Sequence, residues 1–145
     1  MRKFLFIPVI LLGLLCYQAC AQPRSAETDS NTGIQFFKGS WEEALAEAKA
    51  ENKLIFMDAY ARWCGPCKIM ARNVFTDPKT GDFFNENFIN VKMDMQRGEG
   101  PALSRKYGVR AYPTLFFIDH TGKVVHSALG YHKTSELIRL GKGIL

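Results

Sequence analysis

The sequence predicts an α/β fold in which helices flank a mixed central β-sheet on both faces. Three observations lead to this class. Helical and strand patterns alternate along the chain, one strand run is apolar on both of its alternating sides, and the last two strand runs are joined by a hairpin signal. Strands connected through helices pair in parallel, whereas strands in a hairpin are antiparallel, so the sheet must be mixed. The 145 residues, 47% of them hydrophobic, suffice for one globular domain.

The expected elements begin just after residue 33. A short strand is expected at 34–37. A helix over 41–51 starts at a capping box formed by Ser40 and Glu43. The apolar run 54–60 predicts a central strand that is covered on both faces. The later elements are expected as a helix at 65–75, a short helix near Phe83 and Phe84, a strand at 88–94, a helix at 101–107, strands at 114–119 and 123–129, and a helix at 134–140.

The first 21 residues differ from the rest of the chain and predict a secretory signal peptide. Arg2 and Lys3 are basic, and the apolar run that follows, 4–15, is shorter than the roughly 20 residues of a membrane-spanning helix. Two processing routes fit the residues around Cys20: cleavage at a small-residue site, which would release a soluble protein, or lipidation of Cys20, which would anchor the domain to a membrane. An uncleaved membrane anchor is a further alternative. We expect an exported protein that is periplasmic or associated with the cell envelope.

The segment after the signal peptide predicts a flexible tether. Residues 22–32 are polar and small, so the folded domain is expected at 33–145. The formal net charge of the whole chain is +5, and it falls to +3 once Arg2 and Lys3 leave with the signal peptide. This mild excess, without a clustered basic run, argues against nucleic acid as a partner.

Cys64 and Cys67 are the two cysteines that remain in the domain, and three chemistries compete for them: a metal site, a structural disulfide and a redox pair. A structural zinc site needs four cysteine or histidine ligands. The other candidates, His120, His126 and His132, are six residues apart and lack the spacing of a ligand pair. We therefore expect no metal and no organic cofactor.

The residues between the two cysteines favour redox chemistry. If a helix begins at Gly65, Cys64 lies at its N-terminus, where the helix dipole and unpaired amides stabilise a thiolate, the reactive form of cysteine. Cys67 lies one turn further on and faces the same side, and Pro66 suits the first turn because it needs no amide donor there. Gly65 allows another chain to approach Cys64. We expect an exposed, catalytic disulfide rather than a static clip, since so short a loop constrains the unfolded chain little.

A charged residue within the apolar strand run is a further candidate for a chemical role. Asp58 is the one charged residue in the apolar run, so burial should raise its pKa. It either shuttles the proton of Cys67 during exchange or satisfies backbone amides at the end of the strand, and the spacing alone does not decide between these roles.

Pro113 stands at the start of an expected strand, a position that suits a residue without an amide donor. From the pattern alone, the Tyr112–Pro113 bond would be trans.

The run WCGPCK from Trp63, the upstream acid and the run VRAYPT that contains Pro113 closely resemble thioredoxin. The resemblance extends from Ile34 to the C-terminus and implies the thioredoxin fold. It implies that Cys64 attacks a substrate disulfide, that Cys67 resolves the mixed disulfide, and that Asp58 assists Cys67. It also implies a cis Tyr112–Pro113 bond beside the sulfurs. The residues that would contact substrate are Trp63, Gly65, Pro66, Tyr112 and Pro113.

A longer segment, 40–78, is similar to secreted thioredoxin-like domains of the disulfide-isomerase and interchange type. Two departures from thioredoxin stand out. Asn90 takes the place where thioredoxin has a lysine near the buried acid, which would leave the acid without that charge. Tyr60 replaces a tryptophan beside the active site.

The resulting hypothesis is a monomeric thiol-disulfide oxidoreductase of the cell envelope that acts on protein disulfides. The Gly-Pro dipeptide resembles that of reducing thioredoxins and favours a reductase or an isomerase, although direction depends on redox poise. An exported reductase would need a membrane protein as its electron donor. The alternative is a chaperone-like module that binds extended peptides around Pro113, with exchange incidental.

Overall fold

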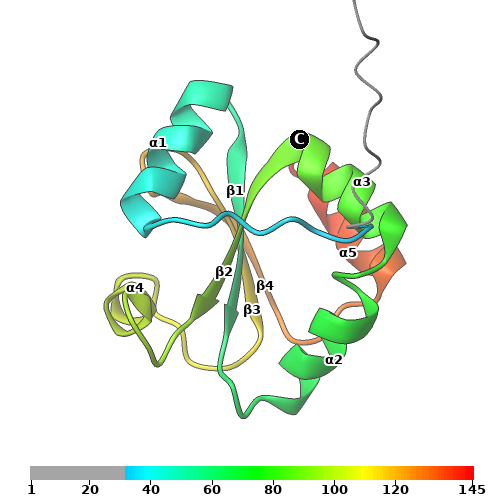
Figure 1. Ribbon diagram of the computed structural model, residues 1–145. Coiled ribbons are helices and arrows are strands. Elements are labelled where there is room, and N and C mark those ends of the chain that lie inside the picture. The colour runs from blue at the N-terminus through cyan, green and yellow to red at the C-terminus, as the bar shows by residue number, and fades with distance from the viewer. Residues whose placement is uncertain (1–31) are drawn as a thin grey trace, which may run out of the picture.

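The computed structural model describes residues 32–145, which form four strands and five helices. The expected signal peptide lies outside the described residues, as does the tether apart from Thr32. In chain order the elements are α1 (Trp41–Glu51), β1 (Leu54–Tyr60), α2 (Gly65–Asn73), α3 (Pro78–Asn87), β2 (Phe88–Asp94), α4 (Gly100–Lys106), β3 (Thr114–Ile118), β4 (Val124–Leu129) and α5 (Thr134–Lys142). Figure 1 shows their arrangement. Within these residues, no helix is long and apolar enough to cross a membrane.

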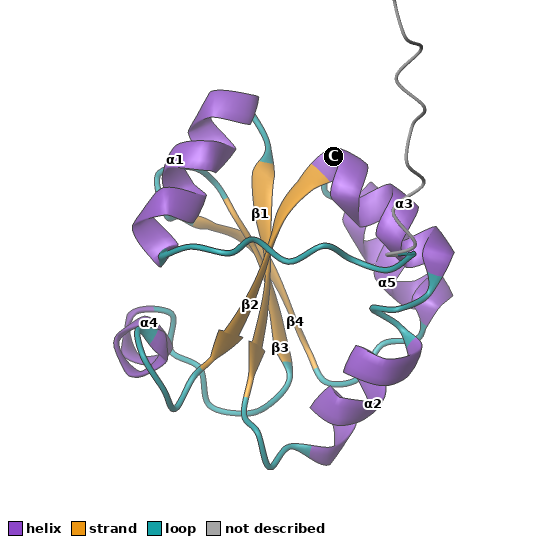
Figure 2. Cartoon of the chain, in the orientation of Figure 1, coloured by secondary structure: helices purple, strands orange, loops and turns teal. Residues whose placement is uncertain are grey.

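The sheet is mixed, as the sequence predicts. Its strand order is β2-β1-β3-β4, with β1 parallel to β2 and antiparallel to β3, and with β3 antiparallel to β4. Helices α1 and α4 lie on one side of the sheet, and α2, α3 and α5 lie on the other (Figure 2). This is the arrangement of a thioredoxin fold, and the predicted α/β class is confirmed.

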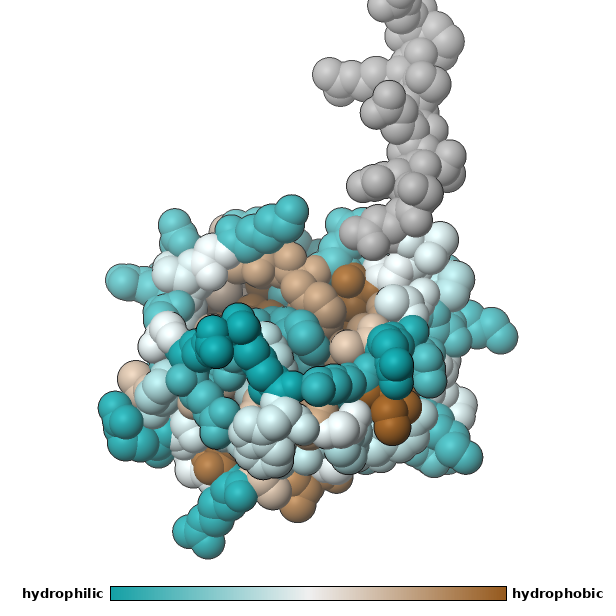
Figure 3. All heavy atoms as spheres, turned by 60° about the horizontal axis from the view of Figure 1, so that its bottom comes forward, coloured by the Kyte–Doolittle hydropathy of each residue, from teal (hydrophilic) through white to brown (hydrophobic). Residues whose placement is uncertain are grey.

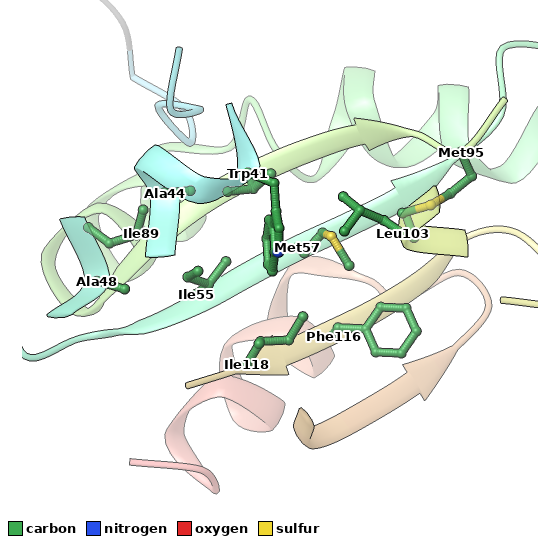
Figure 4. Packing of buried hydrophobic residues seen from close by; sticks show 12 residues of the cluster. Trp41, Ala44, Ala48, Ile55, Met57, Ile89, Met95, Leu103, Phe116 and Ile118 are labelled. Atoms are coloured by element: carbon green, nitrogen blue, oxygen red, sulfur yellow. The ribbon is translucent and has the colours of Figure 1, made fainter. Parts of the chain in front are cut away.

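Alternation along β1 divides the core into two clusters. Ile55 and Met57 face α1, where they pack with Trp41, Ala44 and other apolar residues (Figure 4). The intervening positions face α2, α3 and α5, where Phe56 and other aromatic rings dominate. All five inner residues of β1 are buried, so the prediction of a strand covered on both faces is confirmed. The same alternation places Asp58 on the face that α2 covers.

The expected strand at 34–37 does not form, and this prediction is wrong. The segment crosses the sheet instead of running along its edge strand (Figure 1). Its backbone makes two separated contacts, from the Ile34 amide to the Phe75 carbonyl at 2.6 Å and from the Phe37 amide to the Asn90 carbonyl at 2.7 Å. Two isolated hydrogen bonds to different elements cannot build a ladder, which requires regular bonds to one neighbour.

The short helix expected near Phe83 and Phe84 is the ten-residue helix α3. Asp77 caps its N-terminus by accepting from the Lys79 amide at 2.9 Å, and Pro78 occupies the first turn. Gly81 allows the incoming chain to lie against this helix, since a Cβ there would come within 2.6 Å of the Thr32 carbonyl oxygen. The start of the described chain is thereby held against α3.

Candidate active site

Cys64 and Cys67 form a disulfide at the N-terminus of α2. Their sulfurs are 2.07 Å apart and their Cα atoms 5.3 Å apart. Cys64 is the N-cap residue, and its sulfur accepts a hydrogen bond from the Cys67 amide at 3.2 Å. Pro66 lies in the first turn, where no amide donor is required. The geometry inferred from the sequence, with the first sulfur at the unpaired amides of a helix, is therefore present.

The disulfide is less exposed than expected, because each cysteine residue is only 3% accessible. Ala61 is fully buried beside the two cysteines, and the rings of Tyr60 and Tyr112 pack against them. The Gly65 side is different: a Cβ placed there would meet nothing within 4 Å. A partner can approach the disulfide from that side, whereas the tyrosines cover it elsewhere.

Two aromatic side chains, Trp63 and Tyr112, lie beside the cysteine pair. Trp63 is 67% exposed, yet its indole nitrogen donates to the Gln96 side-chain oxygen at 2.9 Å. Its ring meets the ring of Tyr112 edge-to-face with centroids 5.7 Å apart. Figure 3 turns the lower end of the view in Figure 1, where α2 begins, toward the viewer; hydrophilic side chains stand in front, and apolar surface shows within a hollow in the upper part of this face. The hydrogen bond to Gln96 holds the exposed Trp63 indole in place beside the cysteines.

The Tyr112–Pro113 peptide bond is cis. The trans expectation from the pattern alone is thus wrong, and the expectation from the resemblance to thioredoxin is confirmed. Pro113 is buried just before β3, and its carbonyl accepts from the Gly130 amide at 2.8 Å, which ties the loop to the end of β4. Tyr112 precedes the strand, so its backbone is not committed to the sheet.

Asp58 is fully buried in the middle of β1, and it forms an ion pair with Lys92 of β2. The Lys92 ammonium donates to one carboxylate oxygen at 2.6 Å, and the other oxygen has no hydrogen-bond partner among the described residues. Burial raises the pKa of the Asp58 carboxyl above its ordinary value, and the nearby ammonium lowers it by a smaller amount. A carboxylate whose conjugate acid has a raised pKa is a stronger base than an exposed aspartate.

The ion pair is connected to the redox pair through a small cavity. The cavity measures about 200 Å³ and is lined by Tyr60, Ala61, Arg62, Cys67, Lys68, Ala71 and Lys92. Cys67 and Lys92 therefore open onto the same space, and Lys92 reaches Asp58 directly. The Lys92 ammonium also lies 4.5 Å from the centroid of the Tyr60 ring, a cation–π contact that helps to hold it. Cys67, and not Cys64, lines the space that leads to the buried acid.

The assignment of Asn90 to the lysine position of thioredoxin is wrong. Lys92 is the residue directly opposite Asp58 in the parallel pair, whereas Asn90 lies opposite Phe56. Asn90 is buried two residues earlier and donates to the Phe84 carbonyl and to Asn85, both at 3.2 Å. Sequence analysis missed Lys92. Lys92 and Asp58 are each the fifth residue of their strands, but the bounds of two strands do not fix the register in which they pair.

Metal ligation finds no support in the part of the chain that the structure describes. Among residues 32–145, no three His, Cys, Asp or Glu side chains come together in a way that could hold a metal ion. The ring of His126 packs near Phe117 on β3 and lies apart from the cysteines in the fold.

The family model described as thioredoxin-like matches residues 37–120, more than half of the chain. The chain belongs to the thioredoxin-like family. Thioredoxin H4 of Arabidopsis thaliana is 36% identical over 93 residues, which cover 64% of this chain and 73% of that protein. A solution structure from Bacteroides thetaiotaomicron, provisionally described as a disulphide isomerase, is 47% identical with a TM-score of 0.69, covering 77% of this chain and 93% of its own. Together with the cysteine pair, these relatives make this thioredoxin-like chain a protein-disulfide oxidoreductase.

A longer relative shares this domain with the chain. The thiol:disulfide interchange protein DsbD of Pseudoalteromonas atlantica is 27% identical over 108 residues, which cover 72% of this chain but only 18% of that protein. The similarity is therefore to one part of a larger molecule.

Proposed function

We propose that this thioredoxin-like domain reduces or isomerises protein disulfides in the cell envelope through Cys64 and Cys67. The observation that carries the proposal is the position of the Cys64 sulfur, which accepts the Cys67 amide at the N-terminus of α2. The same amide and the helix dipole stabilise a thiolate there once the disulfide is reduced. The thiolate is the nucleophile in disulfide exchange.

The reaction proceeds in two exchange steps. The Cys64 thiolate attacks one sulfur of a substrate disulfide, which forms a mixed disulfide and releases the other substrate sulfur as a thiolate that takes up a proton. Cys67 then loses its proton and attacks the Cys64 sulfur. This step releases the reduced substrate and leaves the Cys64–Cys67 disulfide, the state that the structure contains. Two electrons pass from the cysteine pair to the substrate.

Asp58 is proposed to take the proton of Cys67 in the second step. The support is the cavity that Cys67 shares with Lys92, together with the 2.6 Å contact between Lys92 and the acid. Because burial raises the pKa of Asp58, its carboxylate is a stronger base than an exposed aspartate. The Lys92 ammonium lowers this pKa by a smaller amount and so favours the charged carboxylate, which is the form that accepts a proton.

Substrate is proposed to bind across the face formed by Trp63, Gly65, Pro66, Tyr112 and Pro113. The exposed indole supplies apolar contact, and the open space at Gly65 admits a second chain to the sulfurs. The backbone of Tyr112 is free of the sheet and can pair with an extended polypeptide. No metal or organic cofactor is required by this chemistry.

Location and electron supply form a second part of the proposal. The basic start and short apolar run of residues 1–21 support export, after which Cys20 is either removed or lipidated. An exported reductase must be recharged, and a membrane thiol-disulfide protein is the proposed donor. The similarity to one part of the interchange protein DsbD supports a role in such a relay.

An insulin-reduction assay with dithiothreitol as the electron source tests the function. The wild-type chain is expected to accelerate the precipitation of reduced insulin chains, and Cys64→Ser is expected to fall to the uncatalysed rate. Ser127→Ala, an exposed change on β4, serves as the control and should retain the wild-type rate. If Cys64→Ser kept its biological activity, the protein would instead be a peptide-binding module in which exchange is incidental.

A further inference from the structure

We propose that a basic groove between α2, α3 and α5 binds an acidic segment of the protein substrate, so that the enzyme favours disulfides flanked by aspartate or glutamate. The inference rests on the proposed function, because the groove would select what the cysteine pair reduces. It concerns residues outside the redox motif and the cis-proline loop. We call this feature the α5 groove and define it by its four cations: Lys79, Lys133, Arg139 and Lys142.

The α5 groove is a cavity of about 710 Å³, within the range of pockets that hold ligands. It lies where α2 ends and α3 begins, and α5 forms its other wall. Val74, Ile138 and the half-exposed ring of Tyr131 supply apolar surface within it. The groove therefore combines an apolar floor with a cationic edge.

The four cations of the α5 groove are available for a ligand. All four residues are exposed, and among residues 32–145 none of their side chains forms an ion pair. Asp77 is the one carboxylate that lines the cavity. Both of its oxygens are already used, one by the Lys79 amide and the other by the Thr134 hydroxyl at 3.1 Å. The groove thus carries an excess of positive charge.

Helix α1, on the other face of the sheet, has the reverse charge, whereas α4 on that face ends in Arg105 and Lys106. Helix α1 contains four glutamates and one lysine and covers the other face of the sheet. An acidic ligand would be attracted to the α5 side and repelled from the α1 side. Such charge complementarity directs encounter and selects among partners.

One backbone contact links the edge of the groove to the cis-proline loop of the proposed substrate face. Tyr131 lines the groove, and the residue before it, Gly130, donates its amide to the Pro113 carbonyl at 2.8 Å. A substrate chain that pairs beside Pro113 would reach the groove within a few residues, since an extended chain advances about 3.3 Å per residue. The acidic residues that it recognises should therefore lie about two to six positions from the reactive cysteine.

The spread of charge favours an extended acidic chain over a single small anion. Lys133 and Lys142 are nine residues apart across α5, which corresponds to about 14 Å along a helix. One phosphate cannot touch both ends of this row, whereas several carboxylates along a peptide can. The open cavity and its apolar floor suit the backbone and methylene groups of such a peptide.

Peptide pairs of matched length test the proposal with the full chain. Each peptide holds one cysteine in a disulfide with a quenched fluorophore and carries, two to six positions away, either three glutamates or three glutamines. The wild-type chain, recharged by dithiothreitol, is expected to reduce the glutamate peptide about tenfold faster at low salt, measured as kcat/KM. At about 0.5 M salt the advantage should shrink to about twofold, because the charges are screened.

Two triple variants with the same change of charge separate the groove from the net charge. Lys133→Gln/Arg139→Gln/Lys142→Gln is expected to lose the preference for the glutamate peptide and to reduce the glutamine peptide at the wild-type rate. Lys38→Gln/Lys49→Gln/Lys123→Gln removes three exposed lysines elsewhere and should keep the preference.

The possible results distinguish failure of the groove proposal from failure of the proposed redox function. Equal rates for the two peptides with the wild-type chain would overturn the groove proposal while leaving the redox function intact. Equal losses in the two triple variants would also overturn it, because net charge alone would then explain the preference. If the wild-type chain reduced neither peptide nor insulin, the redox function itself would fail. Binding of phosphate or anionic vesicles without a peptide preference would count against the proposal as well.

Discussion

The two sulfurs of the disulfide face different surroundings. Cys64 caps α2, next to the exposed ring of Trp63 and the open space at Gly65. Cys67 lies one turn inside the helix and lines the cavity that Lys92 also lines. In the proposed mechanism the outer sulfur would meet the substrate, and the inner sulfur would face the proposed proton-handling groups.

This difference separates the two exchange steps in space. A nucleophile that must exist as a thiolate before substrate arrives is best placed at a helix N-terminus, where amides stabilise the charge. A sulfur that must become nucleophilic only after the mixed disulfide forms needs a base that acts at that moment. Asp58, buried and with a raised pKa, suits this second requirement.

Loss of the inner sulfur should have the largest effect. Cys67→Ser is expected to lower insulin turnover by more than about a thousandfold, since the attack that resolves the mixed disulfide is removed while the outer nucleophile remains. Mixed disulfides with substrate should then accumulate and be visible on non-reducing gels. Wild-type turnover in this variant would show that the two sulfurs do not divide the reaction.

Loss of the buried acid should have the next largest effect. Asp58→Asn keeps the shape of the side chain but removes the base, and it is expected to slow the release of substrate from the mixed disulfide by about a hundredfold, the lower range for general base catalysis. Single-turnover measurements isolate this step. The control is Asp82→Asn, a change of an exposed residue, which should leave the rate of substrate release unchanged. An equal slowing of the Cys64 attack would argue against a role confined to the inner sulfur.

A smaller effect is expected when the partner of the acid is removed. Lys92→Gln eliminates the ammonium that lowers the pKa of Asp58, so that pKa should rise further. At pH values below the pKa of Asp58 less carboxylate is then present, and the resolving step should slow there by about three- to tenfold, since below the pKa a rise of one in the pKa lowers the carboxylate fraction about tenfold. The pH profile of that step should shift to higher pH. An unchanged profile would exclude coupling between Lys92 and the inner sulfur.

Because Asp58 is buried, the free energy of unfolding should depend on pH. Its pKa in the folded state lies above that in the unfolded state, near 3.9, so between these values the folded protein binds more protons. The contribution of Asp58 to the free energy of unfolding is therefore present at low pH and is lost as pH rises through the folded pKa. Asp58→Asn should be more stable than the wild type at pH 7, by about 1.4 kcal/mol for each pH unit that separates the folded pKa from the unfolded one.

Denaturant titrations of both chains measure this difference. The gain of Asp58→Asn should vanish below the unfolded pKa, where the wild-type acid is protonated in both states. A variant that is less stable than the wild type at pH 7 would show that the ion pair with Lys92 stabilises the fold more than burial of the acid destabilises it.

The sequence predicts correctly those parts of the fold that depend on patterns of neighbouring residues. The apolar run 54–60 and the hairpin that follows β3 depend on patterns of neighbouring residues, and both are confirmed. The segment 34–37 has strand-like residues but meets two different elements, so its outcome depends on tertiary contacts.

The site is predicted less completely because its details depend on how strands and loops meet. Asn90 and Lys92 are two residues apart, so both point to the same face of β2, and alternation cannot tell which lies opposite Asp58. Only the pairing register decides it. Likewise, the burial of the cysteines depends on Tyr60 and Tyr112, which come from distant parts of the chain.

The acidity of the Cys64 sulfur is the central claim, and alkylation of the reduced Cys67→Ser chain tests it most directly. The rate of reaction with iodoacetamide, measured against pH, reports the fraction of Cys64 thiolate without interference from the inner sulfur. The rate should reach half its maximum well below pH 8.5, near which a free cysteine titrates. A midpoint at or above that of a free cysteine would contradict the proposed mechanism.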